Sequence, residues 1–167
     1  MGDIMLESFD ETFDLYWDLL CNYFSKSQLR TYHRQKIICN MSNYKISFIK
    51  QNSDIVAFAS WWDFDWCIFL EYISVIEKYR NKGIGSTVLK EILCCNELLI
   101  LECLEDDIEL LTFYKKRGFV VNNIDYTPIK LNIDNETDKY LILSYKRKLS
   151  DYEYNKFLNE IHNPKYN

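Results

Sequence analysis

The residues whose types and spacing most clearly suit ligand binding form a short cationic turn that contains two glycines. Lys78, Arg80 and Lys82 precede Gly83 and Gly85, and a helical pattern of apolar residues starts there. A helix that begins after a glycine turn presents unpaired backbone N–H groups and the positive end of its dipole, and both attract anions. Glycine also lets a phosphate approach the backbone closely. The turn is therefore predicted to bind a phosphate-bearing ligand.

A buried strand before this turn and a helix after it must hold the turn in place. Residues 66–76 are apolar at both alternating sets of positions, which is typical of a strand covered on both faces. From Ile84 onward, apolar residues recur at helical spacing. A Gly-x-Gly pair alone is also typical of an ordinary tight turn. Neither the third glycine of a dinucleotide-binding fingerprint nor the Gly-Lys-Ser/Thr of a P-loop follows it.

The turn and a second motif downstream resemble those of the GNAT acyltransferases. The acyl-CoA loop of that family has the pattern Arg/Gln-x-x-Gly-x-Gly/Ala, and this chain has it at 80–85. Asn81 stands where many members carry glycine, and asparagine tolerates a left-handed backbone well. The family also shows Leu-Glu-Val and then Tyr-x-x-x-Gly-Phe, which correspond here to Leu-Glu-Cys at 101–103 and to 114–119. The resemblance covers residues 44–147.

The resemblance implies where acetyl-CoA would bind. The Ile73 N–H would polarise the acyl carbonyl, and Val75 would offer backbone pairing to the pantetheine. The implied co-substrate residues are Ile73, Ser74, Val75, Arg80, Asn81, Lys82, Gly83, Ile84, Gly85, Ser86 and Asp107. Asp107 stands where the family has asparagine. Because each would place a carboxylate against the pyrophosphate, Gly83→Asp and Gly85→Asp are expected to abolish binding and to leave the fold intact.

Direct acetyl transfer to an amine needs a neutral amine, a donor to the developing oxyanion and an acid for the thiolate. Tyr114 matches the family tyrosine that often supplies this proton, and the alternative is a helix aromatic packed on the sheet. Strand alternation would place five residues on one face: Cys67, Phe69, Glu71, Ile73 and Val75. Glu71 is the ionisable one, and we expect either a general base or an ion pair with a helix residue. As a base, its replacement by glutamine would cut turnover about tenfold or more and remove the acidic limb of the pH profile.

Composition excludes several other classes of protein. A chain of 167 residues, 48% hydrophobic and 27% charged, is typical of one globular domain spanning 1–167. A net charge of −5 argues against nucleic-acid binding. No hydrophobic run has membrane-span length and the N-terminus does not resemble a signal peptide, so we expect a cytoplasmic protein without membrane contact. The six cysteines form no Cys-x-x-Cys pair and neither histidine neighbours one, so we expect buried thiols and no metal.

The pattern of elements predicts an α/β fold with a mixed sheet, which is the GNAT architecture. We expect about seven strands with helices on both faces, and an extra C-terminal helix over 150–161. The strands are predicted at 4–8, 44–50, 55–62, 66–76, 98–103, 119–130 and 139–146. A helical pair before residue 44, with its second helix over 28–38, would form one wall of the acceptor site. In this family the fourth and fifth strands splay apart, and the pantetheine lies between them.

Three functions are compatible with these motifs. The first is direct acetyl transfer from acetyl-CoA to a primary amine of a small molecule or peptide. The second is an acyl-CoA-binding or interaction module that keeps the fold without catalysis. The third is a covalent relay through Cys103, which ends a strand near the cleft. The apolar stripe of the last helix must be covered by its own domain or by a second chain, and we expect a homodimer.

Overall fold

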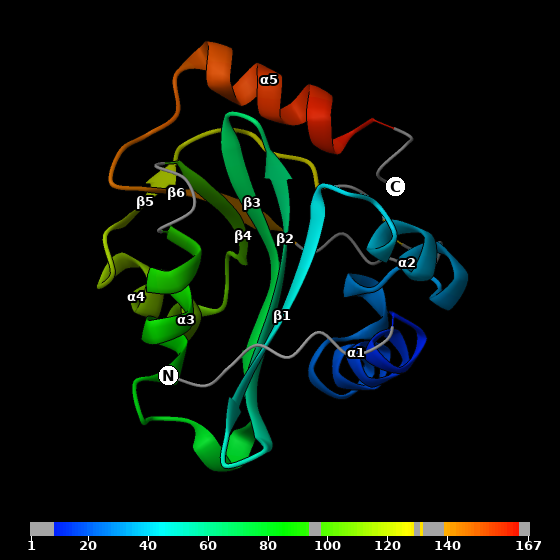
Figure 1. Ribbon diagram of the computed structural model, residues 1–167. Coiled ribbons are helices and arrows are strands. Elements are labelled where there is room, and N and C mark those ends of the chain that lie inside the picture. The colour runs from blue at the N-terminus through cyan, green and yellow to red at the C-terminus, as the bar shows by residue number, and fades with distance from the viewer. Residues whose placement is uncertain (1–8, 94–97, 129–130, 132–138, 164–167) are drawn as a thin grey trace.

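A mixed sheet forms the centre of the protein in a computed structural model (Figure 1), which describes all residues except 1–8, 94–97, 129–130, 132–138 and 164–167. Within this part of the chain the sheet has six strands, in the order β1-β2-β3-β4-β6-β5. The strands are β1 Tyr44–Gln51, β2 Asp54–Phe64, β3 Cys67–Val75, β4 Leu99–Leu104, β5 Phe119–Asn122 and β6 Tyr140–Tyr145. The strand predicted at 4–8 lies outside the described residues.

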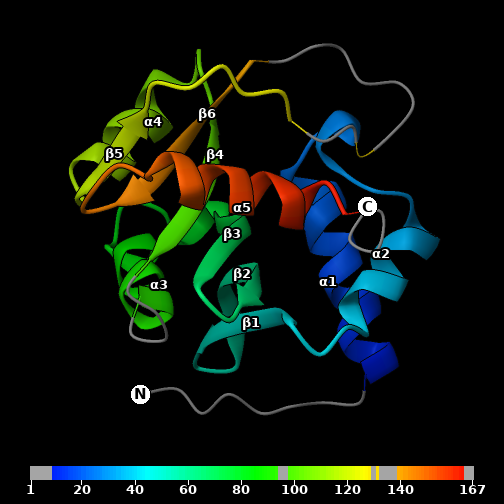
Figure 2. The same ribbon diagram turned by 90° about the horizontal axis from the view of Figure 1, so that it is seen from above.

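Helices cover both faces of this sheet, as predicted. The α-helices are α1 Phe9–Tyr23, α2 Tyr32–Cys39, α3 Ile84–Leu93, α4 Ile108–Lys115 and α5 Asp151–Ile161, with short 3-10 helices η1 Lys26–Gln28 and η2 Glu77–Tyr79. Figure 2 shows α1 and α2 on one face and α3 and α4 on the other. The second predicted helix, 28–38, is in fact η1 followed by α2, because Thr31 caps a new helix with its side chain.

A bulge in β3 changes which side chains face the site. The register between β2 and β3 shifts so that Glu71, between Leu70 and Tyr72, has no opposite residue on β2. One extra residue reverses the alternation of the side chains that follow it. Ile73 and Val75 consequently pack with the core under α3 and α4. The predicted shared face for Cys67, Phe69, Glu71, Ile73 and Val75 is therefore wrong, because Cys67 and Phe69 belong to the opposite core.

Strands β3 and β4, which are the fourth and fifth strands of the predicted order, separate next to this bulge. They pair in parallel only from Ile68 with Leu99 to Leu70 with Leu101. Beyond this point β3 continues to Val75 along β2, while β4 continues to Leu104 along β6. The splayed strands that the resemblance implied are thus present, and they leave backbone groups of both strands facing an opening in the sheet.

The fifth strand is shorter than predicted. It ends at Asn122, and the described residues that follow, 123–128, are irregular rather than extended. The buried side chain of Asn122 donates to the Ile142 carbonyl and accepts from the Leu149 N–H, so it replaces the strand ladder with side-chain bonds. The chain then turns toward the splayed strands and brings Tyr126 to them.

The C-terminal helix packs on its own domain. Phe157 and Ile161 are buried in the same core as Ile38 of α2, and the Phe157 ring lies 5.1 Å from that of Phe69. Figure 1 shows α5 across one end of the sheet. The apolar stripe that suggested a homodimer is therefore covered within the chain. Among the described helices, none combines the length and the apolarity that crossing a bilayer requires.

Candidate active site

The predicted anion loop adopts the backbone that its sequence indicated. Asn81 and Gly83 have φ angles of +61° and +79°, so the left-handed conformation expected at Asn81 is confirmed. The chain enters α3 directly afterwards, at Ile84. A Cβ atom on Gly83 would meet no heavy atom within 4 Å, so the space beside this glycine is open. The loop therefore has the shape and the room that an anion needs beside a helix N-terminus.

Gly85 serves helix packing rather than open space. A Cβ atom there would lie 3.3 Å from the Phe113 ring of α4 and 3.5 Å from a Val75 methyl group. The missing side chain lets α3 approach α4 and β3 closely. An aspartate at Gly85 would press on this contact, so the expectation of an intact fold is kept only for Gly83.

The cations of the loop are partly engaged by the protein itself. The Lys78 ammonium lies 3.2 Å from the Asp54 carboxylate, which also accepts from the Tyr79 hydroxyl. These two donors lower the pKa of Asp54. The Arg80 guanidinium donates to the Val75 carbonyl at 3.2 Å. A phosphate at the loop would thus compete with an internal acceptor for Arg80.

Arg117 is a further cation at the start of α3, and sequence reasoning missed it. Its guanidinium donates to the Ser86 hydroxyl at 2.8 and 2.6 Å and stacks on the Phe113 ring at 3.5 Å. It lies within the Tyr-x-x-x-Gly-Phe motif, at a position that the motif leaves unspecified. The contact adds positive charge beside the helix N-terminus and strengthens its attraction for anions.

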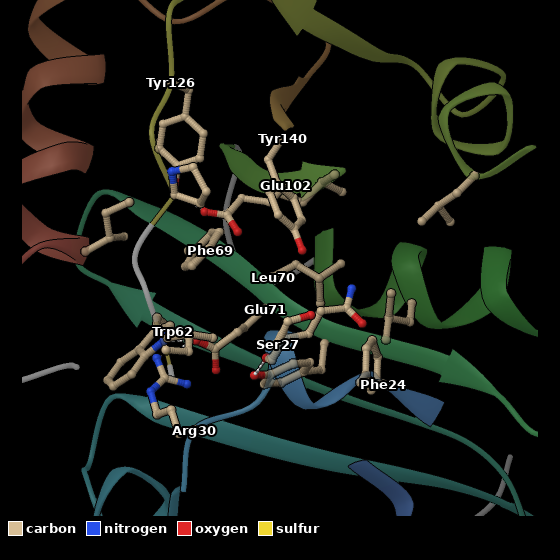
Figure 3. Close-up of a pocket in the computed structure, with 18 of the residues that line it drawn as sticks. Phe24, Ser27, Arg30, Trp62, Phe69, Leu70, Glu71, Glu102, Tyr126 and Tyr140 are labelled. Carbon is tan, nitrogen blue, oxygen red and sulfur yellow. Dashed lines mark hydrogen bonds and ion pairs between the residues drawn. The ribbon is translucent and has the colours of Figure 1, made fainter. Parts of the chain in front are cut away.

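A cavity of about 410 Å³ opens where β3 and β4 separate (Figure 3). Leu110 and Tyr114 line it from the α4 side of the sheet, while Phe24 and Arg30 line it from the side of α1 and α2. Ile73 lies between them on β3. The cavity therefore reaches both faces of the sheet, so two reactants could meet in it from opposite sides.

Two carboxyl groups flank the opening of the splay. The last paired residues are Leu70 and Leu101, and the next residue on each strand is a glutamate, Glu71 and Glu102. Figure 3 shows both side chains at the cavity. Neighbouring buried carboxyl groups disfavour each other's charged form, so their environments decide which one ionises readily.

Glu71 is held in an ion pair. Its carboxylate lies 2.7 Å from the Arg30 guanidinium, and the side chains are 8% and 3% exposed. The Tyr44 hydroxyl donates to it at 2.8 Å and the Trp62 indole N–H at 3.3 Å. The ion-pair alternative is therefore the arrangement in this structure, although Arg30 precedes α2 instead of lying in a helix. These three donors engage the Glu71 carboxylate within the protein.

No cation of the described part of the chain forms an ion pair with Glu102, the residue that sequence reasoning overlooked. Burial raises the pKa of its carboxyl to about 7, and the nearby Glu71 charge acts in the same direction. The Tyr126 hydroxyl donates a hydrogen bond to it, which opposes the rise. A carboxyl that titrates near neutrality can exchange protons with an amine. An acidic residue inside the apolar run of β4 was the signal that could have identified it.

Tyr114, Cys103 and Asp107 occupy the α4 side of the site. Tyr114 is 3% exposed and lines the cavity, and burial raises the pKa of its phenol. Burial also raises the pKa of the Cys103 thiol to about 11, so little thiolate forms at neutral pH. Asp107 caps α4 by accepting from the Leu110 N–H at 2.9 Å. Ser74 lies on β3 opposite Phe58 of β2.

Comparisons with known proteins agree with this geometry. The sequence model of the acetyltransferase (GNAT) family matches residues 9–119. No curated protein matches the chain in sequence. A GNAT-family protein from Bacteroides thetaiotaomicron superposes with a TM-score of 0.83, at 18% identity over 98% of this chain and 97% of the other. The ribosomal-protein-S18-alanine N-acetyltransferase of Escherichia coli gives 0.64, at 18% identity over 90% and 96%.

A GNAT-family acetyltransferase from Elizabethkingia anophelis, solved with acetyl-CoA bound, gives a TM-score of 0.51, at 19% identity over 64% of this chain and 78% of the other. At these identities, the structural similarities support the fold alone. The family match extends over more than half of the chain and includes the cationic loop, the splayed strands and Tyr114. The protein therefore belongs to the GNAT acetyltransferase family.

Proposed function

We propose that this protein transfers an acetyl group from acetyl-CoA directly to a primary amine of a small molecule or peptide. The observation that carries the proposal is the cavity through the sheet, with a carboxyl of raised pKa, Glu102, and a buried phenol, Tyr114, on its walls. Direct transfer needs a proton acceptor for the amine and a proton donor for the thiolate in one enclosed space. These two side chains supply both groups.

The residues at the loop fit acetyl-CoA. The open space beside Gly83, the start of α3 and the cations Lys82 and Arg117 suit its pyrophosphate. Unpaired backbone of β3 past Leu70 suits the amides of pantetheine. When bound, acetyl-CoA supplies a thioester carbonyl that an amine can attack. The GNAT structure from Elizabethkingia anophelis contains this molecule.

Three groups of the chain would carry the transfer. Glu102 accepts a proton from the incoming ammonium, because its pKa near 7 leaves it basic yet able to release the proton again. The Ile73 N–H stabilises negative charge on the carbonyl oxygen. Tyr114 donates its proton to the sulfur as the thiolate departs. We assign Glu71 a structural role, since Arg30, Tyr44 and Trp62 already satisfy it.

The first test measures release of free CoA thiol with a panel of polyamines, amino acids, aminoglycosides and peptides with free N-termini. We expect at least one amine to be acetylated, and intersecting lines in a double-reciprocal plot. Tight binding of acetyl-CoA without turnover of any amine would indicate a binding module instead. Parallel lines would indicate a covalent relay, for which buried Cys103 is the candidate.

Aspartate at Gly83 is expected to weaken acetyl-CoA binding by about a hundredfold or more, since it places a negative charge against the pyrophosphate. Gly83→Asn is the matched control, because asparagine has the same shape and also tolerates the positive φ angle. Calorimetric titration of both variants isolates the effect of the charge. Equal affinity of the two variants would remove the loop from the binding site.

Phenylalanine at Tyr114 is expected to lower kcat about tenfold or more, because the thiolate then loses its proton donor. The ring stays packed against Phe113 and Phe119, so acetyl-CoA affinity should change little. Steady-state kinetics combined with calorimetry separate the two quantities. The acid role fails if kcat is unchanged, or if kcat and affinity fall together.

A further inference from the structure

The side of the cavity that faces α1 and α2, where the acceptor amine would bind, is lined by aromatic rings from several elements. Phe24 follows α1, Trp62 lies on β2, Phe69 on β3 and Tyr140 on β6, and Tyr126 comes from the segment after β5. Figure 3 shows Tyr126, Tyr140 and Phe69 around Glu102. Flat rings favour a flat apolar partner through stacked and edge-to-face contacts. The same ring faces also attract a cation, which an ammonium group supplies.

The charges inside this chamber favour a single cation. Of the residues that the structure describes, four charged side chains line the cavity: Arg30, Glu71, Glu102 and Lys139. Arg30 and Glu71 neutralise each other at 2.7 Å. Lys139 is exposed to solvent. Among the described lining residues, Glu102 is thus the one carboxyl left to meet a substrate ammonium, and a polyamine would bring further charges without acidic partners.

Polar groups on the walls are largely used within the protein. The Tyr126 hydroxyl donates to Glu102, and the Tyr72 hydroxyl donates to the Gln28 carbonyl at 2.6 Å. The Arg30 guanidinium also donates to Gln35. A peptide or an aminoglycoside would bury many of its own polar groups here, and each unpaired one would weaken binding. The chamber is therefore better matched to an acceptor with one polar end.

We propose that the preferred acceptor is an arylalkylamine, a primary amine joined by a short aliphatic arm to one aromatic ring. The ammonium group lies against Glu102, and the ring lies among Phe24, Phe69 and Tyr140. This inference rests on the proposed acetyl transfer and specifies its substrate class. A C–N bond forms as the C–S bond breaks, which gives an amide and free CoA thiol. The ammonium passes one proton to Glu102, Tyr114 gives its proton to the sulfur, and the second nitrogen proton returns to the Tyr114 oxygen.

The test compares kcat/KM for 2-phenylethylamine, 2-cyclohexylethylamine, spermidine and a dipeptide with a free N-terminus. The cyclohexyl compound is the matched control, because it keeps the arm and the apolar bulk but lacks the ring face. We expect kcat/KM for 2-phenylethylamine to be about tenfold or more above that for spermidine and the dipeptide. We expect it to be a few fold above that for 2-cyclohexylethylamine. Spermidine or the dipeptide performing equally well or better would overturn the proposal.

A substitution in the wall gives a second measurement. Phe24→Leu keeps an apolar side chain and removes a ring that is partly exposed in the cavity. We expect it to reduce the preference for 2-phenylethylamine over 2-cyclohexylethylamine severalfold. A preference that is unchanged would place the substrate ring elsewhere and contradict the assignment.

Failure of the inference and failure of acetyl transfer give different results. If another amine class is acetylated best, the inference fails and the transfer stands. If no amine is acetylated, transfer fails, and calorimetry of 2-phenylethylamine and spermidine with the CoA-loaded protein tests the chamber itself. Stronger binding of 2-phenylethylamine would support an arylalkylamine site, and its weaker or undetectable binding would overturn it.

Discussion

Replacing Glu102 by glutamine is expected to cut kcat about a hundredfold or more and to remove the acidic limb of the pH–rate profile. The wild-type rate should fall as the pH drops below about 7, because a protonated Glu102 cannot accept the amine proton. Glutamine keeps the shape of the side chain and can still accept from the Tyr126 hydroxyl. The loss would therefore reflect the missing base rather than a collapsed cavity.

The measurement is kcat/KM from about pH 6 to about pH 9 for the wild type and three variants. Glu105→Gln is the matched control, since Glu105 is exposed just beyond β4 and should keep the wild-type profile. Glu71→Gln should keep the acidic limb, because Arg30, Tyr44 and Trp62 already bind the Glu71 carboxylate. An acidic limb that persists in Glu102→Gln and disappears in Glu71→Gln would return the base role to Glu71.

Glu102→Gln should lower activity but raise the free energy of unfolding at pH values above about 7. Burial raises the pKa of Glu102 from an ordinary 4.5 to about 7, so between these values the folded protein keeps a proton that the unfolded chain has lost. The free energy of unfolding therefore falls as the pH rises through this window. The Glu102 side chain is only partly buried from solvent, so we expect a loss of about 1–3 kcal/mol at pH 8. Denaturant titration of Glu102→Gln at that pH should recover it.

Replacing Arg30 by methionine is expected to lower the free energy of unfolding by about 3–5 kcal/mol. The substitution removes the guanidinium that neutralises Glu71 and leaves a carboxylate of 8% exposure without its cation. The remaining bonds from Tyr44 and Trp62 would satisfy only part of that charge. The damage should extend to the cavity, because Glu71 occupies the β3 bulge beside the splay.

A double variant shows whether the charge causes this loss. Arg30→Met with Glu71→Gln removes both charges and keeps acceptor and donor atoms for Tyr44 and Trp62, so it should be more stable than Arg30→Met alone. Urea denaturation of the wild type, both single variants and the double variant provides the thermodynamic cycle. Additive losses in that cycle would mean that the two side chains do not act as a pair.

Much of the fold followed from local patterns in the chain. The apolar runs of β3 and β4 and the helical spacing after Ile84 predicted these elements near their observed bounds. The spacing of Ser150 and Glu153 also predicted the start of α5, since the two residues form the reciprocal bonds of a capping box there. Such features depend on neighbours a few positions apart, so a single sequence displays them.

The candidate site also combines features set by local sequence with features set by tertiary packing. The sequence by itself determined the glycine turn, the left-handed Asn81 and the motif that ends at Phe119, because backbone preference and residue spacing are local properties. Only the tertiary structure decided which glutamate carries a free carboxyl. A bulge in β3 reversed the alternation of side chains at Glu71. Arg30, forty-one positions away in the chain, neutralises the Glu71 carboxylate. Among the described residues no cation is paired with Glu102, and burial beside Tyr126 raises the pKa of its carboxyl. Such burial arises only when distant segments pack together.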